Sequence, residues 1–316
     1  MKSVSIVVPV YNEGDNIEHF AAAVAEEMAK LDYEWELIFV DDGSRDNSLE
    51  IIERLHTENK HIKVLALSRN CGHQMALTCG LDHAQGEAVI SMDGDMQHPP
   101  ALIPELLRNW EAGYEIVQTI RQDTQGVSWL KRKTSELYYR LINNLSSVHI
   151  RPGGSDFRLL DRQAVLALRK YREHDRFLRG MVTLLGFKMA EVPFVAPPRF
   201  AGKSKYSFSK MAKLAVDGIV GYSVVPLRAA FVAGIILALF SFLLFLHVLY
   251  AYICDEAVSG WTTIMVCLSL FGGTQLIMLG VMGEYLGRIY TEVKNRPLYL
   301  LKKNDVDEQG SWERKQ

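Results

Sequence analysis

The chain has 316 residues, of which 48% are apolar and 23% charged, and its formal net charge is −2. This balance gives no reason to expect nucleic-acid binding, which needs a basic surface. The four cysteines (Cys71, Cys79, Cys254 and Cys267) have neither Cys-x-x-Cys nor Cys/His metal spacing, so we expect reduced thiols rather than a disulfide framework or a cysteine metal site.

The first 120 residues alternate between strand and helix patterns. The expected strands are Val4–Val8, Leu37–Val40, Ile62–Leu67, Ala88–Met92 and Ile116–Ile120, and the expected helices are Asp15–Leu31, Ser48–Leu55, Met75–His83 and Ile103–Trp110. These strands are apolar throughout, which is typical of strands covered by helices on both faces. Repeated strand–helix units predict a parallel, doubly wound α/β sheet with ligands at the carboxyl ends of its strands.

Polar and acidic pairs follow three of these strands. They are Asn12 and Glu13 after the first strand, Asp41 and Asp42 after the second, and Asp93 and Asp95 after the fourth. Because the carboxyl ends of parallel strands meet on one side of a sheet, we expect the three pairs to lie together. Solvated loops would scatter their charges over both sides, so this pattern favours a binding site.

The order of elements after residue 120 is less regular. We expect a basic-faced helix over Ser128–Ser146, a short strand over Phe157–Leu160, a helix over Asp175–Gly186, an extended segment over Val192–Pro198 and a basic loop over Arg199–Tyr206. Ser207–Val225 has the pattern of an amphipathic helix. Such a helix can pack on the domain or lie in a membrane interface, and its position beside an apolar run favours the interface.

Two long apolar runs near the C-terminus predict a transmembrane hairpin. Ala229–Tyr252 and Trp261–Gly283 contain no Asp, Glu, Lys or Arg, and each exceeds the roughly 20 residues that cross a hydrocarbon core. The connector is acidic (Asp255, Glu256), whereas the outer flanks are basic (Arg228, Arg288, Lys294, Arg296). By the positive-inside rule, both termini and the first domain are expected on the cytoplasmic side of the membrane.

These features divide the chain into four expected parts. They are a catalytic domain over residues 1–206, an amphipathic interfacial region over 207–226, a transmembrane hairpin over 227–290 and a cytoplasmic tail over 291–316.

Asp93-Gly94-Asp95 is a candidate metal-binding element. It follows an apolar strand, and Gln97 and His98 add polar atoms before two prolines turn the chain into a helix. Mg²⁺ and Mn²⁺ prefer oxygen ligands from one or two carboxylates plus phosphate, so the element suits a diphosphate ligand. The alternative is that these aspartates only cap the following helix.

Asp41 and Asp42 begin a DDGSRD stretch at the end of the second strand. One of them can accept a hydrogen bond from a base N–H or a ribose hydroxyl, with turn structure as the alternative. Asp46 or Asn47 can cap the helix that follows, so not every acid here needs to contact a ligand.

Three segments carry a family resemblance: PVYNE at residues 9–13, DDGSRD at 41–46 and DGDMQHPP at 93–100. Together they resemble the family 2 inverting glycosyltransferases of the GT-A fold. Within that family the chain is similar to dolichyl-phosphate mannose synthases and, more closely, to the bacterial bactoprenol-phosphate glucosyltransferases of the GtrB type. LSRNCG at 67–72, LKRK at 130–133, SDFRL at 155–159 and GEYLGRIY at 283–290 support the closer match. The similarity runs from about Val4 to Leu300.

The resemblance implies a role for each matching residue. Pro9, Tyr11, Glu13, Asp41, Asp42 and Asp93 would bind the nucleotide sugar, and Asp93, Asp95 and Gln97 would surround Mg²⁺ or Mn²⁺. Arg121, Arg132 and Lys205 would hold the phosphate of the lipid acceptor. Arg199 and Lys203, which lie near Lys205 in the basic loop, are expected to bind this phosphate as well. Arg132 and Asp95 count among the expected catalytic residues, together with Asp156.

Asp156 occupies the place where related enzymes carry a catalytic carboxylate. A monoalkyl phosphate is largely a dianion at neutral pH, so it needs a general base less than a sugar hydroxyl does. Asp156 therefore has three open roles: a base, a residue that orients a basic side chain, or a group that stabilises positive charge at the anomeric carbon.

The expected reaction is inverting transfer of glucose from a UDP-sugar to undecaprenyl or another polyprenyl phosphate, supplying a lipid-linked sugar for cell-surface glycans. His73-Gln74 replaces the Lys-Glu of many glucosyl enzymes, and residues 203–206 resemble the SKY element of mannosyl and aminoarabinosyl enzymes. N-acetylglucosamine or another sugar therefore stays an alternative. A non-catalytic nucleotide-sugar scaffold is the alternative from another class. The resemblance also implies a homo-oligomer packed through the hairpin.

Overall fold

The computed structural model describes residues 2–122, 153–195, 197, 223, 225–253 and 260–305. The chain divides into two compact units, which are considered separately. The sheet unit comprises Met1–Asn143, Val148–Met211 and Pro297–Gln316, and the helical unit comprises Asn144–Ser147 and Ala212–Arg296. The expected helix over 128–146, the loop over 199–206 and nearly all of the amphipathic segment over 207–225 lie outside the described residues.

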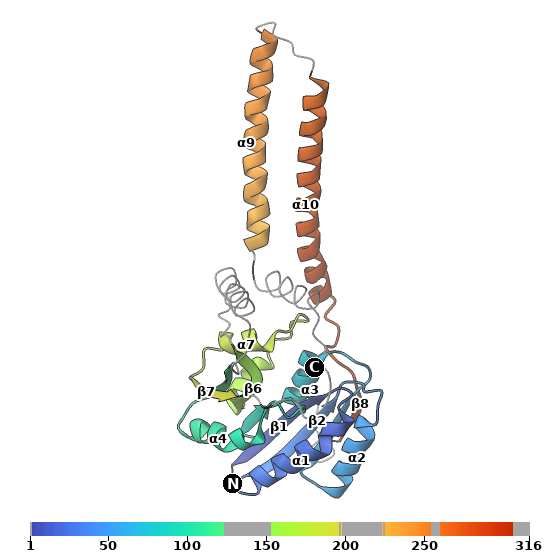
Figure 1. Cartoon of the computed structure of the whole chain (residues 1–316), viewed down its shortest axis with the longest axis vertical. Coiled ribbons are helices and arrows are strands. Elements are labelled where there is room, and N and C mark those ends of the chain that lie inside the picture. The colour runs from blue at the N-terminus through green and yellow to red at the C-terminus, as the bar shows by residue number, and fades with distance from the viewer. Residues whose placement is uncertain are drawn as a thin grey trace. The chain divides into compact units, whose positions relative to one another are not determined.

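The sheet unit is built on one sheet of eight strands in the order β7-β5-β6-β4-β1-β2-β3-β8. Strands β1, β2, β6, β7 and β8 of this sheet are labelled in Figure 1. The strands are β1 (Ser3–Val10), β2 (Glu34–Asp41), β3 (Ile62–Leu67), β4 (Ala88–Ser91), β5 (Ile116–Gln122), β6 (Gly154–Asp161), β7 (Met189–Val195) and β8 (Leu301–Asn304). β1 to β4 are parallel, as predicted, but β6 runs antiparallel to β4 and β5, and β8 antiparallel to β3. The predicted parallel sheet is therefore found for β1 to β5 and β7 but not for β6 and β8, because the residues of a single strand do not specify the direction of its pairing.

Helices cover both faces of this sheet, which confirms the doubly wound architecture. The helices are α1 (Gly14–Met28), α2 (Ser48–Glu58), α3 (His73–His83), the 3₁₀ turn η1 (Pro100–Leu102), α4 (Ile103–Glu111), α6 (Arg162–Leu168) and α7 (Leu178–Leu184). Ile6 and Val8 of β1 join a core with α1, α2 and α4, whereas Val7 joins a second core with α3, α6 and α7. The alternation of side chains along a strand produces these two cores.

Two elements differ from the predicted bounds. The helix expected over Asp175–Gly186 is limited to α7, because Phe177 has an extended backbone (φ −127°, ψ 83°) and ends the non-helical segment before it. The extended segment expected over Val192–Pro198 begins earlier, at Met189, where β7 pairs with the first residue of β5.

Strand β8 was not predicted, because its residues lie in the segment expected to be a tail. It follows the helical unit in the sequence and pairs with β3 at the edge of the sheet. The backbone N–H of Ser68 donates to the carbonyl of Leu300 (2.8 Å), and the Tyr299 hydroxyl donates to Asp82 on α3 (2.8 Å). The segment after the helical unit therefore stabilises the edge strand β3 and the helix beside it.

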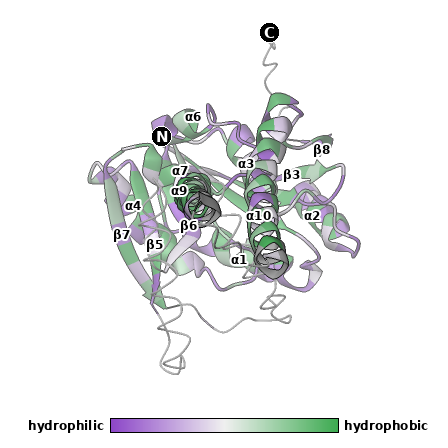
Figure 2. Cartoon of the chain, turned by 90° about the horizontal axis from the view of Figure 1, so that it is seen from above, coloured by the Kyte–Doolittle hydropathy of each residue, from purple (hydrophilic) through white to green (hydrophobic). Residues whose placement is uncertain are grey.

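The helical unit contains two long helices, α9 (Val225–Ile253) and α10 (Trp261–Val293). Hydrophobic residues make up most of α9 (Figure 2). Met278 and Met282 of α10 face α9 residues such as Phe231 and Gly234 across an apolar groove. In the described part of the chain, Val225–Leu244 is the one segment whose length and composition would allow a membrane crossing. A second span and a transmembrane hairpin therefore stay predictions.

Candidate active site

Topology brings the predicted site residues to one side of the sheet, which we call the carboxyl rim. The strand order changes direction between β1 and β4, and ligands of doubly wound sheets bind outside the carboxyl ends of strands at such a point. Because β6 is antiparallel to β4, with Ser91 opposite Arg158, its first residues also reach this rim. Asp156 therefore lies beside the end of β4, and Arg121, near the end of β5, lies on the same side.

The loop after β1 is held by the loop after β2. Asn12 donates its backbone N–H to Ser44 Oγ (3.0 Å), and its side-chain oxygen accepts the backbone N–H of Arg45 (2.8 Å). Glu13 donates its backbone N–H to Ser48 Oγ (3.0 Å). Asn12 has a left-handed backbone (φ +53°), which asparagine tolerates better than most residues. These contacts fix the loop that carries Tyr11 before any ligand binds.

Asp41 and Asp42 have different contacts although both are buried. Asp42 accepts the backbone N–H groups of Cys71 (2.6 Å) and Gly72 (2.9 Å), one on each carboxylate oxygen. Asp41 accepts the backbone N–H of Ser44, shared between its two oxygens at 3.2 Å. Hydrogen bonds from the Ser44 hydroxyl and the Gly43 backbone also act on this carboxylate. Desolvation raises the pKa of both carboxyls. Asp42 therefore holds the loop after β3, whereas Asp41 holds the turn that follows β2.

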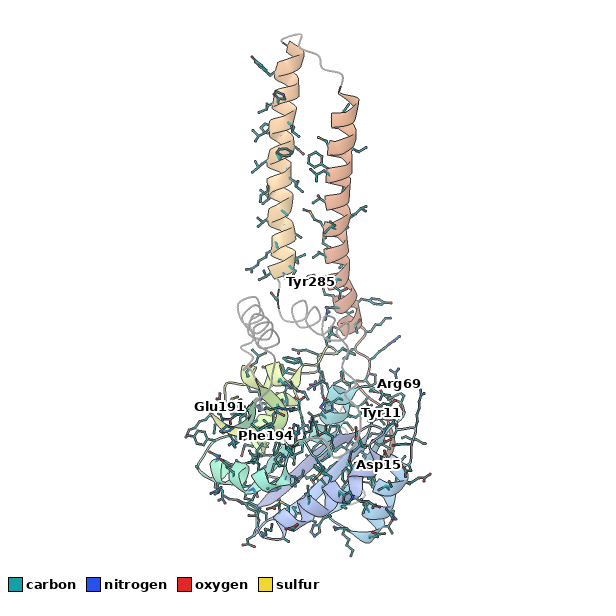
Figure 3. All side chains as sticks on the ribbon, in the orientation of Figure 1. Tyr11, Asp15, Arg69, Glu191, Phe194 and Tyr285 are labelled. Atoms are coloured by element: carbon teal, nitrogen blue, oxygen red, sulfur yellow. The ribbon has the colours of Figure 1, made fainter. Side chains whose placement is uncertain are left out.

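Gly43 lies where the loop after β2 contacts the loop after β3. Its φ is +66°, and a Cβ added there would lie 2.7 Å from the backbone of both Arg69 and Asn70. Arg69 and Tyr11 are labelled in Figure 3. We expect Gly43→Ala to lower the melting temperature of the full-length protein by about 3–10 °C, because strained backbone and a backbone clash together cost about 1–3 kcal/mol or more.

Gly113→Ala is the matched control for this substitution. Gly113 also has a positive φ (+88°), but a Cβ there would meet nothing within 4 Å. Its replacement should cost about 2–4 °C, the effect of backbone strain alone. Equal losses in the two variants would contradict the close contact between the loops.

The loop from Asp93 to His98 is fixed by its own polar groups. Asp93 donates its backbone N–H to Nδ1 of His98 (2.8 Å), and Gln97 donates its backbone N–H to Asp95 Oδ1 (3.1 Å). Met96 between them is left-handed (φ +63°), an uncommon conformation for a side chain of this size. The loop therefore has one defined shape, in which the predicted metal residues are held by backbone contacts.

His98 joins this loop to β6. Because Nδ1 accepts a hydrogen bond, the proton of the neutral ring lies on Nε2, which faces Ser155 Oγ at 2.8 Å. The ring stacks on Phe157 (5.1 Å between centroids) and meets Phe194 edge-on (6.1 Å), which is labelled in Figure 3. Burial lowers the pKa of His98, so the neutral form is stable at neutral pH. His98 thereby sets the distance between Asp93 and the strand that carries Asp156.

Asp156 is buried, with 3% of its surface exposed, and is surrounded by donors. Its Oδ1 accepts from Arg158 (2.7 Å), and its Oδ2 accepts from Arg179 (2.9 Å) and from the side-chain amide of Gln74 (3.3 Å). His73 Nε2 lies 3.6 Å from the same Oδ2. Desolvation would raise the pKa of Asp156, but the charges of Arg179 and Arg158 and the hydrogen bond of His73 hold it well below its usual range.

His73 lies between the two acidic groups of the site. Its Nε2 is 3.5 Å from Asp93 Oδ1 as well as 3.6 Å from Asp156 Oδ2. Desolvation lowers the pKa of His73, but the contact with Asp156 and the charge of Asp93 outweigh it, so the net shift is upward. The first residue of α3 therefore connects the predicted metal loop to Asp156.

The Asp93 loop fits a divalent cation that is bound together with a ligand. Asp93 Oδ1 is buried and has no hydrogen-bond partner among the described residues. Within that part of the chain no three His, Cys, Asp or Glu side chains form a complete metal cage. Two carboxylates of one loop, with phosphate oxygens completing the shell, match how Mg²⁺ is usually held.

Comparison with known sequences identifies the family. The profile of glycosyl transferase family 2 matches residues 5–168, which is more than half of the chain. The chain belongs to glycosyl transferase family 2. It is therefore a glycosyltransferase, and the alternative of a non-catalytic scaffold is set aside.

Similar proteins extend over nearly the whole glycosyltransferase chain. An uncharacterised glycosyltransferase of Bacillus subtilis, YkcC, is 41% identical, covering 95% of this chain and 93% of its own. The bactoprenol glucosyl transferase of Shigella phage SfII is 39% identical, covering 95% of this chain and 98% of its own. Glucosyl-3-phosphoglycerate synthase of Mycobacterium tuberculosis, solved with Mn²⁺ and UDP, covers 69% of this chain and 78% of its own at 18% identity, with a TM-score of 0.45. The last similarity is too low to carry an argument about the site.

Most of the predicted site residues of the glycosyltransferase lie at the carboxyl rim. They are Tyr11, Glu13, Asp41, Asp42, Asp93, Asp95, Gln97, Arg121 and Asp156. Pro9 is buried within β1, opposite Val40. Arg132, Arg199, Lys203 and Lys205 lie outside the described residues. Proximity alone does not assign binding roles, so those roles stay predictions.

The sequence reading did not identify the partners of Asp156 or of Asp93. Arg158, Arg179, Gln74 and His98 come from four separate places in the chain. A usable signal was present for Arg158, which is charged in the middle of an apolar strand and therefore needs a buried partner. Arg179 and Gln74 carry no comparable signal, because each lies in the first turn of a helix, where a polar residue is ordinary.

Proposed function

We propose that this glycosyltransferase transfers glucose from UDP-glucose, with inversion, to the phosphate of a polyprenyl lipid. The observation that carries the proposal is the extent of similarity to the Shigella phage bactoprenol glucosyl transferase. The family profile ends at residue 168, whereas the 39% identity continues over 302 residues and so includes most of the apolar C-terminal part. A relative that acts on bactoprenol shares both the transferase domain and the segment able to enter a membrane.

The rim residues support a nucleotide-diphosphate donor. The interlocked loops after β1 and β2 present Tyr11, Glu13 and Asp41 as groups that can contact a base and a ribose. Such preorganisation lowers the cost of ordering the site when a ligand binds. The pocket for the nucleotide is therefore proposed between the ends of β1 and β2.

Asp93, Asp95 and Gln97 are proposed to hold Mg²⁺ or Mn²⁺ against the donor diphosphate. A bound cation would neutralise the charge that develops on the departing UDP. The hydrogen bond from the backbone of Asp93 to His98 would keep the loop in place while negative charge develops on the leaving UDP. The backbone N–H of Gln97 donates to Asp95, and the side chain of Gln97 is proposed as a further ligand of the cation.

The acceptor phosphate needs orientation more than deprotonation. A monoalkyl phosphate is largely dianionic at neutral pH and is already a nucleophile. Arg121 at the rim, with Arg132, Arg199, Lys203 and Lys205, is proposed to attract this phosphate and align it for in-line attack on the anomeric carbon. The sugar bond to UDP breaks as the phosphate oxygen bonds to the sugar from the opposite side, which inverts the anomeric carbon.

The acceptor lipid requires the enzyme to meet a membrane. The proposed arrangement is a two-span hairpin of α9 and α10 in the bacterial plasma membrane, with the transferase domain and both termini cytoplasmic. The apolar segment Val225–Leu244 and the basic residues that flank the two uncharged runs (Arg228, Arg288, Lys294 and Arg296) support this orientation. A homo-oligomer packed through these helices is part of the proposal, and the product would supply cell-surface glycan modification.

A second donor sugar needs a direct test, because His73 and Gln74, which replace the Lys-Glu of many glucosyl enzymes, contact Asp156. UDP-N-acetylglucosamine is the second candidate. The full-length protein in nanodiscs with polyprenyl phosphate should move radiolabelled glucose into the organic phase, and EDTA should abolish this transfer because the cation is required. Transfer from UDP-N-acetylglucosamine alone would change the donor. Absence of any lipid-linked product with the common nucleotide sugars would overturn the proposed reaction.

A further inference from the structure

The surroundings of Asp156 are unsuited to a catalytic base. A carboxylate oxygen offers about two lone pairs, and Oδ2 already faces Arg179, Gln74 and His73. Oδ1 accepts from Arg158, which is 2% exposed and is also bound to the carbonyl of Leu178. An incoming proton would have to displace one of these donors. The geometry instead makes Asp156 an acceptor that holds other side chains.

The donors around Asp156 differ in how far they reach the solvent. Arg158 is enclosed, whereas 41% of the side chain of Arg179 is exposed, and the same fraction holds for His73. Arg179 is the second residue of α7, and His73 is the first residue of α3. Asp156 therefore binds one cationic group inside the protein and two nitrogen-bearing groups at the surface of the rim.

An exposed arginine at the rim suits an anionic ligand. Two guanidinium groups contact the carboxylate of Asp156, and Arg179 is the one whose side chain is also exposed. Arg179 and His73 both contact Asp156 Oδ2, and His73 Nε2 also lies 3.5 Å from Asp93 Oδ1. Gln74 fixes the arrangement from two sides, because its side-chain oxygen accepts the backbone N–H of Leu178 (3.0 Å) while its amide donates to Asp156.

We propose that Asp156 is a positioning residue that presents Arg179, with His73, as donors to a phosphate oxygen of a substrate. The inference rests on the proposed function for the identity of that substrate. The phosphate belongs either to the donor diphosphate or to the lipid acceptor, since both carry the same anionic oxygens. In either case Arg179 contacts substrate, and Asp156 acts through Arg179.

Binding measurements separate the two sources without requiring turnover. Calorimetry on the full-length protein in nanodiscs measures the affinity for UDP with Mg²⁺ and, separately, for geranyl phosphate. Arg179→Ala should weaken one of the two ligands about 10–100-fold, the effect of losing a charge-assisted hydrogen bond, and Arg179→Lys should restore part of the loss. Weaker UDP binding assigns the donor diphosphate, and weaker geranyl phosphate binding assigns the acceptor. Affinities for both ligands within about twofold of wild type would overturn the proposal.

Arg172→Ala is the matched control. Arg172 forms an ion pair with Asp82 of α3 (2.6 Å), and this pair lies away from the rim residues. Arg172→Ala should therefore leave the affinities for UDP and for geranyl phosphate unchanged. The binding results stand even if wild type transfers no sugar to a lipid, an outcome that would defeat the proposed function alone.

A double-mutant cycle tests whether Asp156 acts through Arg179. In wild type, Asp156→Asn should lower kcat/KM about tenfold or more, but in the Arg179→Ala background by less than about threefold, since the residue it positions is already absent. A general base would instead cost about 10²-fold or more in both backgrounds. Multiplicative losses would overturn the positioning role.

Discussion

Asp95→Asn is expected to lower the rate of sugar transfer by about 10³-fold while leaving the fold intact. Asp95 lies on a fixed loop where its carboxylate can bind a cation that neutralises the leaving diphosphate. Asparagine is nearly isosteric and can still accept the backbone N–H of Gln97, so the loop should keep its shape. The loss therefore reports the missing charge. Initial rates with UDP-glucose and polyprenyl phosphate over a range of Mn²⁺ concentrations measure it.

Asp32→Asn is the control for this substitution. Asp32 is exposed and precedes β2, so it lies on the side of the sheet opposite the carboxyl rim. It should leave the rate unchanged. Retained transfer by Asp95→Asn, with unchanged dependence on Mn²⁺, would remove Asp95 from the metal site.

Arg158→Leu is expected to have the largest effect on stability. Arg158 is buried, and its guanidinium binds Asp156 and the backbone carbonyls of Ser155 and Leu178. Burial lowers the pKa of Arg158 to about 10, so the group remains charged at neutral pH. Breaking such a pair leaves a buried carboxylate short of a partner and costs about 3–5 kcal/mol, or about 6–20 °C in melting temperature.

Two further variants test whether the loss of stability in Arg158→Leu comes from breaking the buried pair with Asp156. Arg172→Leu removes an arginine of the exposed pair with Asp82 and should shift the melting temperature by about 4 °C at most. Asp156→Asn combined with Arg158→Leu should lose less stability than the two single losses added together, because the unpaired charge is gone. Strict additivity would contradict a coupled buried pair.

The sequence predicted the carboxyl rim well because the relevant signals are local. Each polar pair directly follows an apolar strand, so Asn12, Asp41 and Asp93 could be placed at strand ends from residues a few positions away. The direction of β6 was not predictable in this way. β6 is buried along most of its length, and its residues carry no mark that distinguishes parallel from antiparallel pairing with β4.

Contacts between distant residues account for the rest of what was missed. Gln74 and Asp156 are 82 positions apart, and Tyr299 and Asp82 are 217 positions apart, so neither pair has a signature in one sequence. Strand β8 is only four residues long and pairs across the whole intervening chain. The contacts of Asp156 with Gln74, Arg158 and Arg179 support the proposed positioning role over the role of a base, which the sequence left open.

The structure of the lipid product tests the central claim most directly. Full-length protein in nanodiscs, given UDP-glucose, a divalent cation and polyprenyl phosphate, should yield a lipid that carries one hexose on its phosphate. Mass spectrometry should find this phosphodiester, and NMR should find the β-anomer, because in-line attack inverts the α-linkage of the donor. Glucose attached to a hydroxyl group, a retained α-linkage or no modified lipid would contradict the account.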